Sequence, residues 1–390
     1  MGVLADLEFD PYSRQCLEDP YPVYRALLEN APLYHSEKRG FWAVSRHADI
    51  QRCARDWETF SSRGGVDLSG SVGLAGPGGF LDMDPPRHDQ LRRIVRSSFT
   101  PKAICALEDT VRDQVRVIGA EIRERGVADL GRDLARPLPL RLVCTLLGFP
   151  PADYGDLERW FGPMVRRAPD TTAVPASAHE AAEAMRGYID DMAAQRARHP
   201  SDDLLGALVS AELRGELTAQ ERTGICVLLF LAGISTAAGL ISTSLYLLEA
   251  HPVQRRALLR EPAIIPTAVE ELLRYVSPVQ ALARTTTRPV ELHGSFLPEG
   301  ARLLLVFAAA NRDPRRFADP DELQLRRKAE RNLGFGEGIH FCLGANLARL
   351  QMRVVLDTLL PLMPEFSVSG PIRWMSTPGD RGIESLPIRV

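Results

Sequence analysis

The chain has 390 residues, of which 45% are hydrophobic and 25% charged, so it is long and apolar enough to form a large buried core. Its formal net charge of −3 provides no overall positive charge for binding nucleic acid. The first residues lack the basic segment and apolar core of a signal peptide, and the most apolar stretch, 225–234, is shorter than the roughly 20 residues that span a membrane. We therefore expect a soluble, monomeric protein of the cytoplasm that binds neither nucleic acid nor membrane.

Apolar residues recur at intervals of three and four through most of the chain, and this spacing predicts amphipathic helices. Shorter stretches rich in β-branched and aromatic residues predict a few strands. The expected helices are 19–30, 47–56, 106–126, 138–147, 178–198, 202–213, 218–250, 253–259, 264–274 and 345–360, and the expected strands lie near 41, 289 and 301 and at 366–370 and 386–390. This pattern is that of a mainly α protein with small β-sheets, and the absence of a repeat or linker favours one domain over residues 1–390.

Two irregular segments interrupt this pattern. Residues 61–80 are rich in glycine and form a longer connection than compact domains usually contain, which favours a functional or mobile loop. Residues 375–386 form a turn-rich segment near the C-terminus.

One of the six cysteines has unusual neighbours. The six are scattered and form no CxxC pair, which argues against a zinc site and against a disulfide framework. Cys342 alone lies in a glycine-rich run, FGEGIHFCLG, directly before a predicted helix whose N-terminal N–H groups would stabilise a thiolate. A haem ligand, a catalytic nucleophile and a buried core thiol all remain possible for such a cysteine.

The same run, Phe-Gly-x-Gly-x-His-x-Cys-x-Gly, resembles the haem-binding signature of the cytochrome P450 monooxygenases. The resemblance implies the single large triangular fold of that family and heme b (iron protoporphyrin IX) as cofactor. Cys342 would be the axial ligand of the iron, and Phe335, Gly336 and Gly344 would shape the loop around it.

Further motifs at family spacing imply the rest of a haem site. His88 and Arg92, four residues apart, together with Arg284 and His340, match the groups that bind the two haem propionates. Glu271 and Arg274 match a Glu-x-x-Arg pair, and Arg316 matches the arginine that completes a Glu-Arg-Arg network.

The predicted central helix resembles the helix that crosses the distal face of the haem. Ala232 and Gly233 would leave space for dioxygen, and Thr236 matches a threonine that donates a hydrogen bond to it. Where the family usually has an acid beside this threonine, the chain has Ser235. A serine relays protons less readily than a carboxylic acid, so we expect Ser235→Asp to speed turnover.

The resemblance implies insertion of one oxygen atom from O2 into a small organic substrate, by hydroxylation, O-demethylation or a related oxidation. Electrons would come from NAD(P)H through a ferredoxin reductase and a ferredoxin, since the chain shows no flavin or nicotinamide domain. Parts of the sequence resemble enzymes that oxidise substituted benzoates, so Arg63, with Ser69 or Ser71, is a candidate carboxylate clamp. Other candidate substrate contacts are Val279, Gln280, Leu282 and Ser376. Alternatives are a secondary-metabolite tailoring oxidase, including one that couples rings, and a haem-thiolate sensor that does not turn over.

Overall fold

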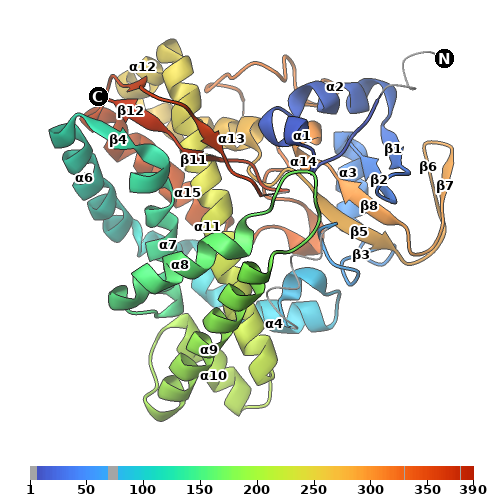
Figure 1. The fold of residues 1–390 in the computed structure, drawn as a ribbon, viewed down its shortest axis with the longest axis horizontal. Helices are drawn as coiled ribbons and strands as arrows, with labels where there is room; N and C mark the ends of the chain where they lie inside the picture. The colour runs from blue at the N-terminus through green and yellow to red at the C-terminus, as the bar shows by residue number, and fades with distance from the viewer. Residues whose placement is uncertain (1–6, 69–77, 329, 378) are drawn as a thin grey trace.

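The computed structural model describes residues 7–68, 78–328, 330–377 and 379–390, and helices are its main elements (Figure 1). The helices are α1 (Arg14–Glu18), α2 (Tyr21–Asn30), α3 (His47–Arg55), α4 (Arg87–Arg96), α5 (Pro101–Cys105), α6 (Glu108–Arg125), α7 (Pro137–Leu147), α8 (Tyr154–Val165), α9 (Ala176–Arg198), α10 (Leu204–Leu213), α11 (Ala219–Ala250), α12 (Pro252–Arg260), α13 (Ile265–Val276), α14 (Phe307–Ala310), α15 (Ala345–Val354) and α16 (Leu360–Leu362). The predicted helices are confirmed to within a few residues at most ends. The one expected over 345–360 is α15 followed by a π-helical turn, η8 (Val355–Leu359).

The sequence pattern did not predict α8. This helix contains Gly155, Gly162 and Pro163, which are poor helix formers, so its local preference for a helix is weak. Leu157, Phe161 and Met164 are buried in the main core, and this packing stabilises the helix where propensity does not.

Helix α11 runs through the middle of the molecule (Figure 1). Thr218 and Glu221 form a capping box at its start, in which each side chain accepts a hydrogen bond from the other residue's backbone N–H. Helices α7, α9, α10, α13 and α15 pack against it, so most of its apolar side chains belong to the main hydrophobic core. Among the described residues, α11 is the one helix long and apolar enough to cross a membrane, and 72% of its most apolar window is buried inside the protein.

The strands form four small sheets. They are β1 (Leu33–Ser36), β2 (Phe41–Val44), β3 (Phe60–Ser61), β4 (Val127–Asp129), β5 (Leu282–Thr286), β6 (Val290–Leu292), β7 (Ser295–Leu297), β8 (Arg302–Leu305), β9 (Ser367–Val368), β10 (Arg373–Trp374), β11 (Ile383–Ser385) and β12 (Pro387–Arg389). The largest sheet has the order β1-β2-β8-β5-β3, with β2 parallel to β8 and β5 antiparallel to it. Pairing of Arg284 with Leu303 fixes the register of β5, and with it the position of the Arg284 side chain.

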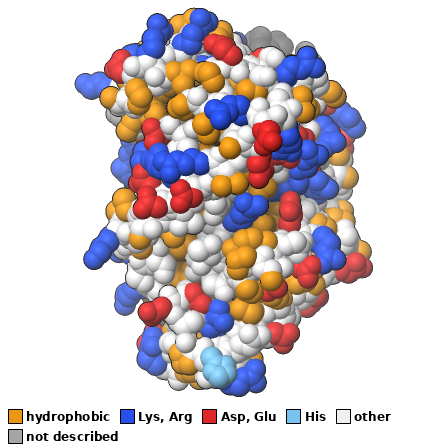
Figure 2. Space-filling model, turned by 90° about the vertical axis from the view of Figure 1, so that its left-hand side faces the viewer, with side chains coloured by type: hydrophobic (Ala, Val, Ile, Leu, Met, Phe, Trp, Pro, Cys, Tyr) orange, Lys and Arg blue, Asp and Glu red, His pale blue; other side chains and the backbone are white. Residues whose placement is uncertain are grey.

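Charges of both signs are mixed over the side of the molecule that carries α6 and the C-terminus (Figure 2). This face has no large area of a single sign, as the net charge of −3 leads one to expect.

Candidate active site

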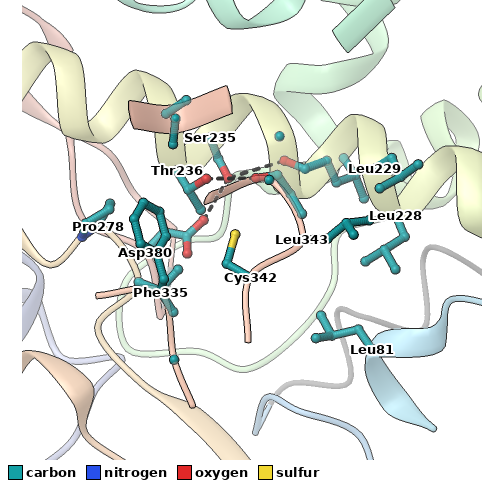
Figure 3. Close-up of a pocket in the computed structure, with 18 of the residues that line it drawn as sticks. Leu81, Leu228, Leu229, Ser235, Thr236, Pro278, Phe335, Cys342, Leu343 and Asp380 are labelled. Atoms are coloured by element: carbon teal, nitrogen blue, oxygen red, sulfur yellow. Dashed lines mark hydrogen bonds between the residues drawn. The ribbon is translucent and has the colours of Figure 1, made fainter. Parts of the chain in front are cut away.

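A cavity of about 370 Å³ lies between α11 and the loop that carries Cys342. The Cys342 side chain points toward the turn of α11 that holds Ser235 and Thr236 (Figure 3). Leucines surround this space on several sides, among them Leu81 and Leu229. The cavity therefore places a sulfur on one wall and two hydroxyl groups on the opposite wall, in surroundings that are mostly apolar.

The Cys342 loop is held by its own backbone and by α3. The Cys342 N–H donates to Phe335 O at 2.9 Å, which closes the loop. Gly338 has φ of 72°, and a Cβ there would overlap the carbonyl oxygen of Ala54 in α3. Only glycine adopts this positive φ without strain and leaves room for the Ala54 carbonyl oxygen, so the backbone of the loop explains why the motif has a glycine here.

Two opposing effects act on the Cys342 thiol. Burial raises its pKa above the ordinary 9.0, while the Gly344 N–H and the positive charges of Arg92 and Arg349 lower it. Burial is the largest of these effects, while the Gly344 N–H at the start of α15 acts in the direction expected from the sequence and favours the thiolate. The protein on its own favours the neutral thiol, and a metal ion bound to the sulfur would be needed to displace the proton.

The four predicted propionate partners lie on the side of the cavity near α4 and β5. The rings of His88 and His340 are 4.6 Å apart, and His340 Nε2 lies 3.0 Å from Ser62 Oγ. Arg92 donates to the carbonyl oxygen of Phe341, next to Cys342 in the chain. Arg284 is 3% exposed and donates to the carbonyl oxygen of Ala283. Residues from three separate parts of the chain, namely α4, β5 and the loop that carries Cys342, thus form one cationic cluster.

The electrostatics of this cluster indicate that an anion belongs there. Burial lowers the pKa of His88 and lowers that of Arg284 to about 10. Burial and the nearby charges of Arg284, His88 and Arg92 lower the pKa of His340 to about 2. The Nε2 atom of His88 is buried and has no hydrogen-bond partner among the described residues. Carboxylates such as haem propionates would supply both the missing partner and the missing negative charge, so these residues fit the cofactor that the sequence implies.

The distal wall is the part of α11 from Ala232 to Thr236. Gly233 leaves room for Val143, since a Cβ on Gly233 would lie 2.7 Å from Val143 Cγ2. Thr236 Oγ1 donates to the carbonyl oxygen of Ala232 at 2.8 Å, an i to i−4 bond that holds its side chain against the helix. Ala232, Gly233, Ser235 and Thr236 all line the cavity, as the sequence analysis expects.

An acid that the sequence analysis did not identify lies beside Ser235. The Ser235 hydroxyl donates to Asp380 Oδ2 at 2.8 Å, although the two residues are 145 positions apart (Figure 3). Asp380 lines the cavity, and burial raises the pKa of its carboxyl from 3.8 to about 6. Asp380 belongs to the turn-rich segment of residues 375–386, and no local pattern in the sequence indicates that this segment pairs with α11.

The ion-pair network behind the loop is confirmed in two of its three members. Glu271 and Arg274 are each about 2% exposed and form two bonds, of 2.7 and 2.9 Å. The predicted third member, Arg316, is wrong: it pairs with Glu330 and is 40% exposed. Arg327 takes the place instead, with Nε 3.0 and 3.1 Å from the Glu271 carboxylate oxygens. Arg327 follows a turn, and its side chain reaches Glu271 on α13. The motif that led to Arg316 contains no information about this contact.

Two of the tentative substrate contacts line the cavity, Val279 and Leu282. Gln280 bonds instead to Tyr24 and to backbone carbonyls, and Ser376 donates to the carbonyl oxygen of Arg167. Arg63 does not line the cavity: its side chain is 69% exposed, and its Nε lies 3.5 Å from Asp84. The expected partners of Arg63, Ser69 and Ser71, lie outside the described residues.

The sequence analysis also missed the buried arginine of the cavity, Arg167. It follows α8, the unpredicted helix, and donates to the carbonyl oxygen of Met164. Its side chain lines the cavity, and burial lowers its pKa.

Comparison with known proteins gives consistent matches. The family model for cytochrome P450 matches residues 263–369. A putative cytochrome P450 123 of Mycobacterium tuberculosis is 36% identical over 391 residues, which cover 99% of this chain and 97% of that protein. The erythromycin C-12 hydroxylase of Saccharopolyspora erythraea is 38% identical over 340 residues, covering 86% and 84%. The solved structure of cytochrome P450 PksS of the Bacillus subtilis bacillaene polyketide synthase superposes with a TM-score of 0.90 at 29% identity, covering 98% and 99%.

Proposed function

Since this chain belongs to the cytochrome P450 family and is a haem-thiolate monooxygenase, we propose that it oxidises a largely apolar secondary metabolite with electrons from a ferredoxin. The observation that carries the proposal is the cavity between Cys342 and the distal turn of α11, whose walls are mostly leucine, valine and phenylalanine side chains. The haem, when bound, supplies the activation of dioxygen, and the chain's own residues bind, orient and shield the reactants.

The residues divide into three roles around that cofactor. Cys342 would supply the axial thiolate, which favours cleavage of dioxygen. The cationic cluster of His88, Arg92, Arg284 and His340 would hold the propionates. On the distal wall, Thr236 lines the cavity, and its hydroxyl would donate to a group there by leaving the Ala232 carbonyl oxygen. The apolar side chains exclude water and so strengthen the interactions of these few polar groups.

The character of the cavity walls supports an apolar substrate over a small acid. The Arg63 clamp, which would suit a benzoate, lies away from the cavity, and the buried arginine that does line it, Arg167, is engaged with backbone carbonyls. Two similar proteins carry names from macrolide or polyketide metabolism, the erythromycin C-12 hydroxylase and the bacillaene synthase P450. We therefore infer a substrate of that general chemistry, oxidised by hydroxylation or a related reaction.

Electron supply by a ferredoxin, reduced in turn by a ferredoxin reductase with NAD(P)H, is supported by exposed cations near the Cys342 side of the molecule. Arg93 and Arg96 are exposed on α4, the helix whose Arg92 contacts the Cys342 loop. Neither takes part in an ion pair among the described residues, so their charges remain available to an acidic partner. We propose that this part of α4 belongs to the docking surface.

The test begins with binding. Haem-loaded protein is titrated with macrolide and polyketide intermediates, and separately with substituted benzoates and their amides, and the spin state of the haem is followed. Compounds that shift it are then incubated with a surrogate ferredoxin, its reductase, NADPH and isotopically labelled dioxygen. One labelled oxygen in a macrolide or polyketide product supports the proposal. Shifts and products from benzoates alone would overturn the substrate assignment.

A further inference from the structure

Asp380 provides a carboxylic acid beside Ser235 of α11, a helix position that itself carries no acid. The sequence resemblance implies a carboxylic acid on this helix beside Thr236, whereas this chain has Ser235 there. Asp380, from the C-terminal segment, lies 2.8 Å from the Ser235 hydroxyl and lines the same cavity. An acid and a hydroxyl therefore meet at the distal wall, although they come from different elements of the fold (Figure 3).

The C-terminal segment packs closely against α11 because each of the two elements has a glycine at the point of contact. A Cβ on Gly239 would overlap the carbonyl oxygen of Arg381, and a Cβ on Gly382 would overlap the backbone of Gly239. One turn farther along α11, Ser242 Oγ accepts a hydrogen bond of 3.1 Å from the Ile383 N–H. Positions 235, 239 and 242 are spaced along one face of the helix, so the segment docks along a single stripe.

The other side of the segment is fixed as well. Val279 and Asp380 form an isolated antiparallel bridge. The Arg381 N–H donates to Pro278 O at 2.7 Å, and the Gln280 N–H donates to Gly379 O at 2.7 Å. Asp380 is thus held from both sides by its neighbours' backbone, which restricts its carboxylate to the position against Ser235.

Among the residues that the structure describes, no cation forms an ion pair with Asp380. The adjacent Arg381 turns its guanidinium to the carbonyl oxygens of Leu17 and Glu18 and packs it over Trp374. On α11 the facing group is the uncharged Ser235. Cys16 and Tyr24 share a second cavity with Asp380, but burial raises the pKa of Cys16 to about 12 and that of Tyr24 well above 10, so both stay neutral.

A buried carboxyl in these surroundings takes up and releases its proton near neutral pH. Burial is the main cause that raises its pKa to about 6, and the Ser235 hydrogen bond opposes this only in part. A general acid transfers protons best when its pKa lies near the working pH, which a serine hydroxyl cannot approach.

We propose that Asp380 supplies protons to the distal side of the cavity through the Ser235 hydroxyl. When Asp380 is protonated, its carboxyl O–H donates to Ser235 Oγ, the reverse of the bond to the carboxylate, and the Ser235 hydroxyl turns to the cavity. The proton then leaves Asp380 Oδ2 for Ser235 Oγ, while Ser235 passes its own hydroxyl proton into the cavity. Each cycle consumes one O2, two protons and two electrons from the ferredoxin, and yields one oxygenated product and one water. The second cavity, of about 20 Å³, adjoins Asp380 and has room for one water, which would return a proton to it.

The rival role for Asp380 is an anchor for the ammonium group of a substrate. The hydrogen bond to Ser235 favours the relay, because an anchor has no need of a hydroxyl that also faces the cavity. The two roles differ in what Ser235 should do, and this difference decides the test.

The experiment compares Asp380→Asn, Ser235→Ala and the double variant in haem-loaded protein with a surrogate ferredoxin and reductase. We expect each single change to slow coupled turnover by roughly 100-fold or more, because a general acid typically contributes about 10²- to 10⁴-fold, and we expect more peroxide to form. The double variant should be no slower than the slower single variant, because both changes break the same path.

In the wild type, turnover should fall as pH rises through about 6, because the acid form of Asp380 is depleted, and Asp380→Asn should lose this dependence on pH.

Placing a carboxylic acid on α11 should rescue the activity that Asp380→Asn loses. In the Asp380→Asn background, Ser235→Asp should restore turnover and its dependence on pH. In the native background, Ser235→Asp would place two carboxylates together, so we now expect it to slow turnover, contrary to the expectation from the sequence.

An infrared titration of the protein provides a readout that needs no turnover. A protonated-carboxyl band should titrate near pH 6 and be absent from Asp380→Asn. Asp82→Asn is the matched control, since burial also raises the pKa of Asp82 and this residue lies outside the cavity wall.

Three results would overturn the proposal. The first is unchanged coupling and pH dependence in Asp380→Asn, and the second is the absence of a titrating band from the wild type. The third is weaker binding of amines alone in Asp380→Asn with normal coupling in Ser235→Ala, which would assign Asp380 to substrate binding. Because turnover and peroxide are measured with any ligand that shifts the spin state, a wrong substrate class would leave this test intact.

Discussion

Cys342 lies where the electrostatics of a helix end compete with burial, and burial has the larger effect on its pKa. The neighbouring N–H of Gly344 and the charges of Arg92 and Arg349 only reduce the cost of ionising the thiol. Loading with haem should therefore release a proton from this sulfur, since a metal-bound thiol is ionised. The cysteine depends on the cofactor for its charge, while the loop fixes its position.

Replacing the proposed ligand tests this assignment at the level of one residue. Cys342→His should bind haem through nitrogen, and the reduced carbon monoxide complex should lose its thiolate-type absorption. Cys105→Ser is the control, because Cys105 is the exposed cysteine and should leave the spectrum unchanged. Survival of the thiolate-type band in Cys342→His would show that another cysteine is the ligand.

Asp380 should lower the stability of the fold at neutral pH. Its pKa rises from 3.8 to about 6 on folding, so the native state binds more protons than the unfolded state between these values, and stability falls as pH rises through them. A tenfold change in proton affinity is worth about 1.4 kcal/mol, which gives at most about 3 kcal/mol here. Asp380→Asn should therefore be more stable than the wild type above pH 6.

Denaturant unfolding at several pH values measures this difference. The advantage of Asp380→Asn should shrink as pH falls and vanish below about 4, where the wild-type carboxyl is protonated in both states. A difference that is the same at all pH values would mean that the variant acts through packing and not through the charge.

Sequence reasoning was effective at residue scale where chemistry is local. Cys342 and the glycines beside it lie within one short loop. Glu271 and Arg274 lie one helical turn apart, so each motif can be recognised from local spacing alone. It missed Asp380 and Arg327, whose partners are 145 and 56 residues away. Such contacts depend on how elements dock, and no local pattern encodes that docking.

At the scale of elements, α11 and the C-terminal segment form the distal wall together. Gly239→Ala should push the segment away from the helix, because the new Cβ would overlap the Arg381 carbonyl oxygen. Overpacking of this kind typically costs about 1–3 kcal/mol. We expect a lower unfolding free energy and, through loss of the bond between Ser235 and Asp380, more peroxide per turnover. Gly187→Ala on α9 is the control, since nothing lies within 4 Å of the added Cβ.

The network of Glu271 ties α13 to the segment that ends at Arg327. Besides the two arginines, Glu271 accepts a bond of 3.0 Å from the Gln324 N–H, so its carboxylate joins the helix to this segment. Removing one partner of a buried ion pair typically costs about 3–5 kcal/mol, because a charge is left unpaired. Arg327→Met should therefore destabilise the protein far more than Arg316→Met, which removes an ion pair that is largely open to solvent.

Thermal or denaturant unfolding of the two variants, together with the haem content after purification, compares their effects directly. Equal stability losses would mean that Arg316 also belongs to the network, as the sequence resemblance implies.

Helices with strong apolar periodicity were predictable from sequence because each buries one continuous stripe, as α6 does, and α11 was predictable from its long apolar run, which is buried on most sides. The helix α8 was not, since its glycines and proline weaken the local signal and packing supplies the stability. Arg167 follows this helix, so the same omission hid a residue of the cavity wall. An error at the scale of an element thus became an error in the site.

At the scale of the whole molecule, binding of an acidic redox partner depends more on where the exposed charges lie than on the net charge. The net charge of −3 provides no long-range attraction for an acidic protein, and the face drawn in Figure 2 carries charges of both signs. Of the basic residues near the Cys342 side, several are already neutralised within the chain: Arg326 by Glu261, Arg331 by Glu337, Arg349 by Glu270 and Arg353 by Glu108. The proposed docking of a ferredoxin would therefore rely on a small number of cations that have no ion-pair partner among the described residues.

Arg93 and Arg96 on α4 meet this requirement, and reversing their charge tests it. The double change Arg93→Glu and Arg96→Glu should slow reduction by the ferredoxin by about 10-fold at low salt, since steering by complementary charge changes association rates by that order or more. The difference should shrink as salt is added, because exposed charges are screened beyond roughly 10 Å at 0.1 M. Substrate binding, followed by the spin state, should not change, as both side chains are exposed and neither lines the cavity. The double change Arg116→Glu and Arg123→Glu on α6 gives the control for net charge, because it alters the net charge by the same amount and both residues are exposed on another helix. A salt-independent loss, or an equal loss in the control, would place the docking surface elsewhere on the molecule.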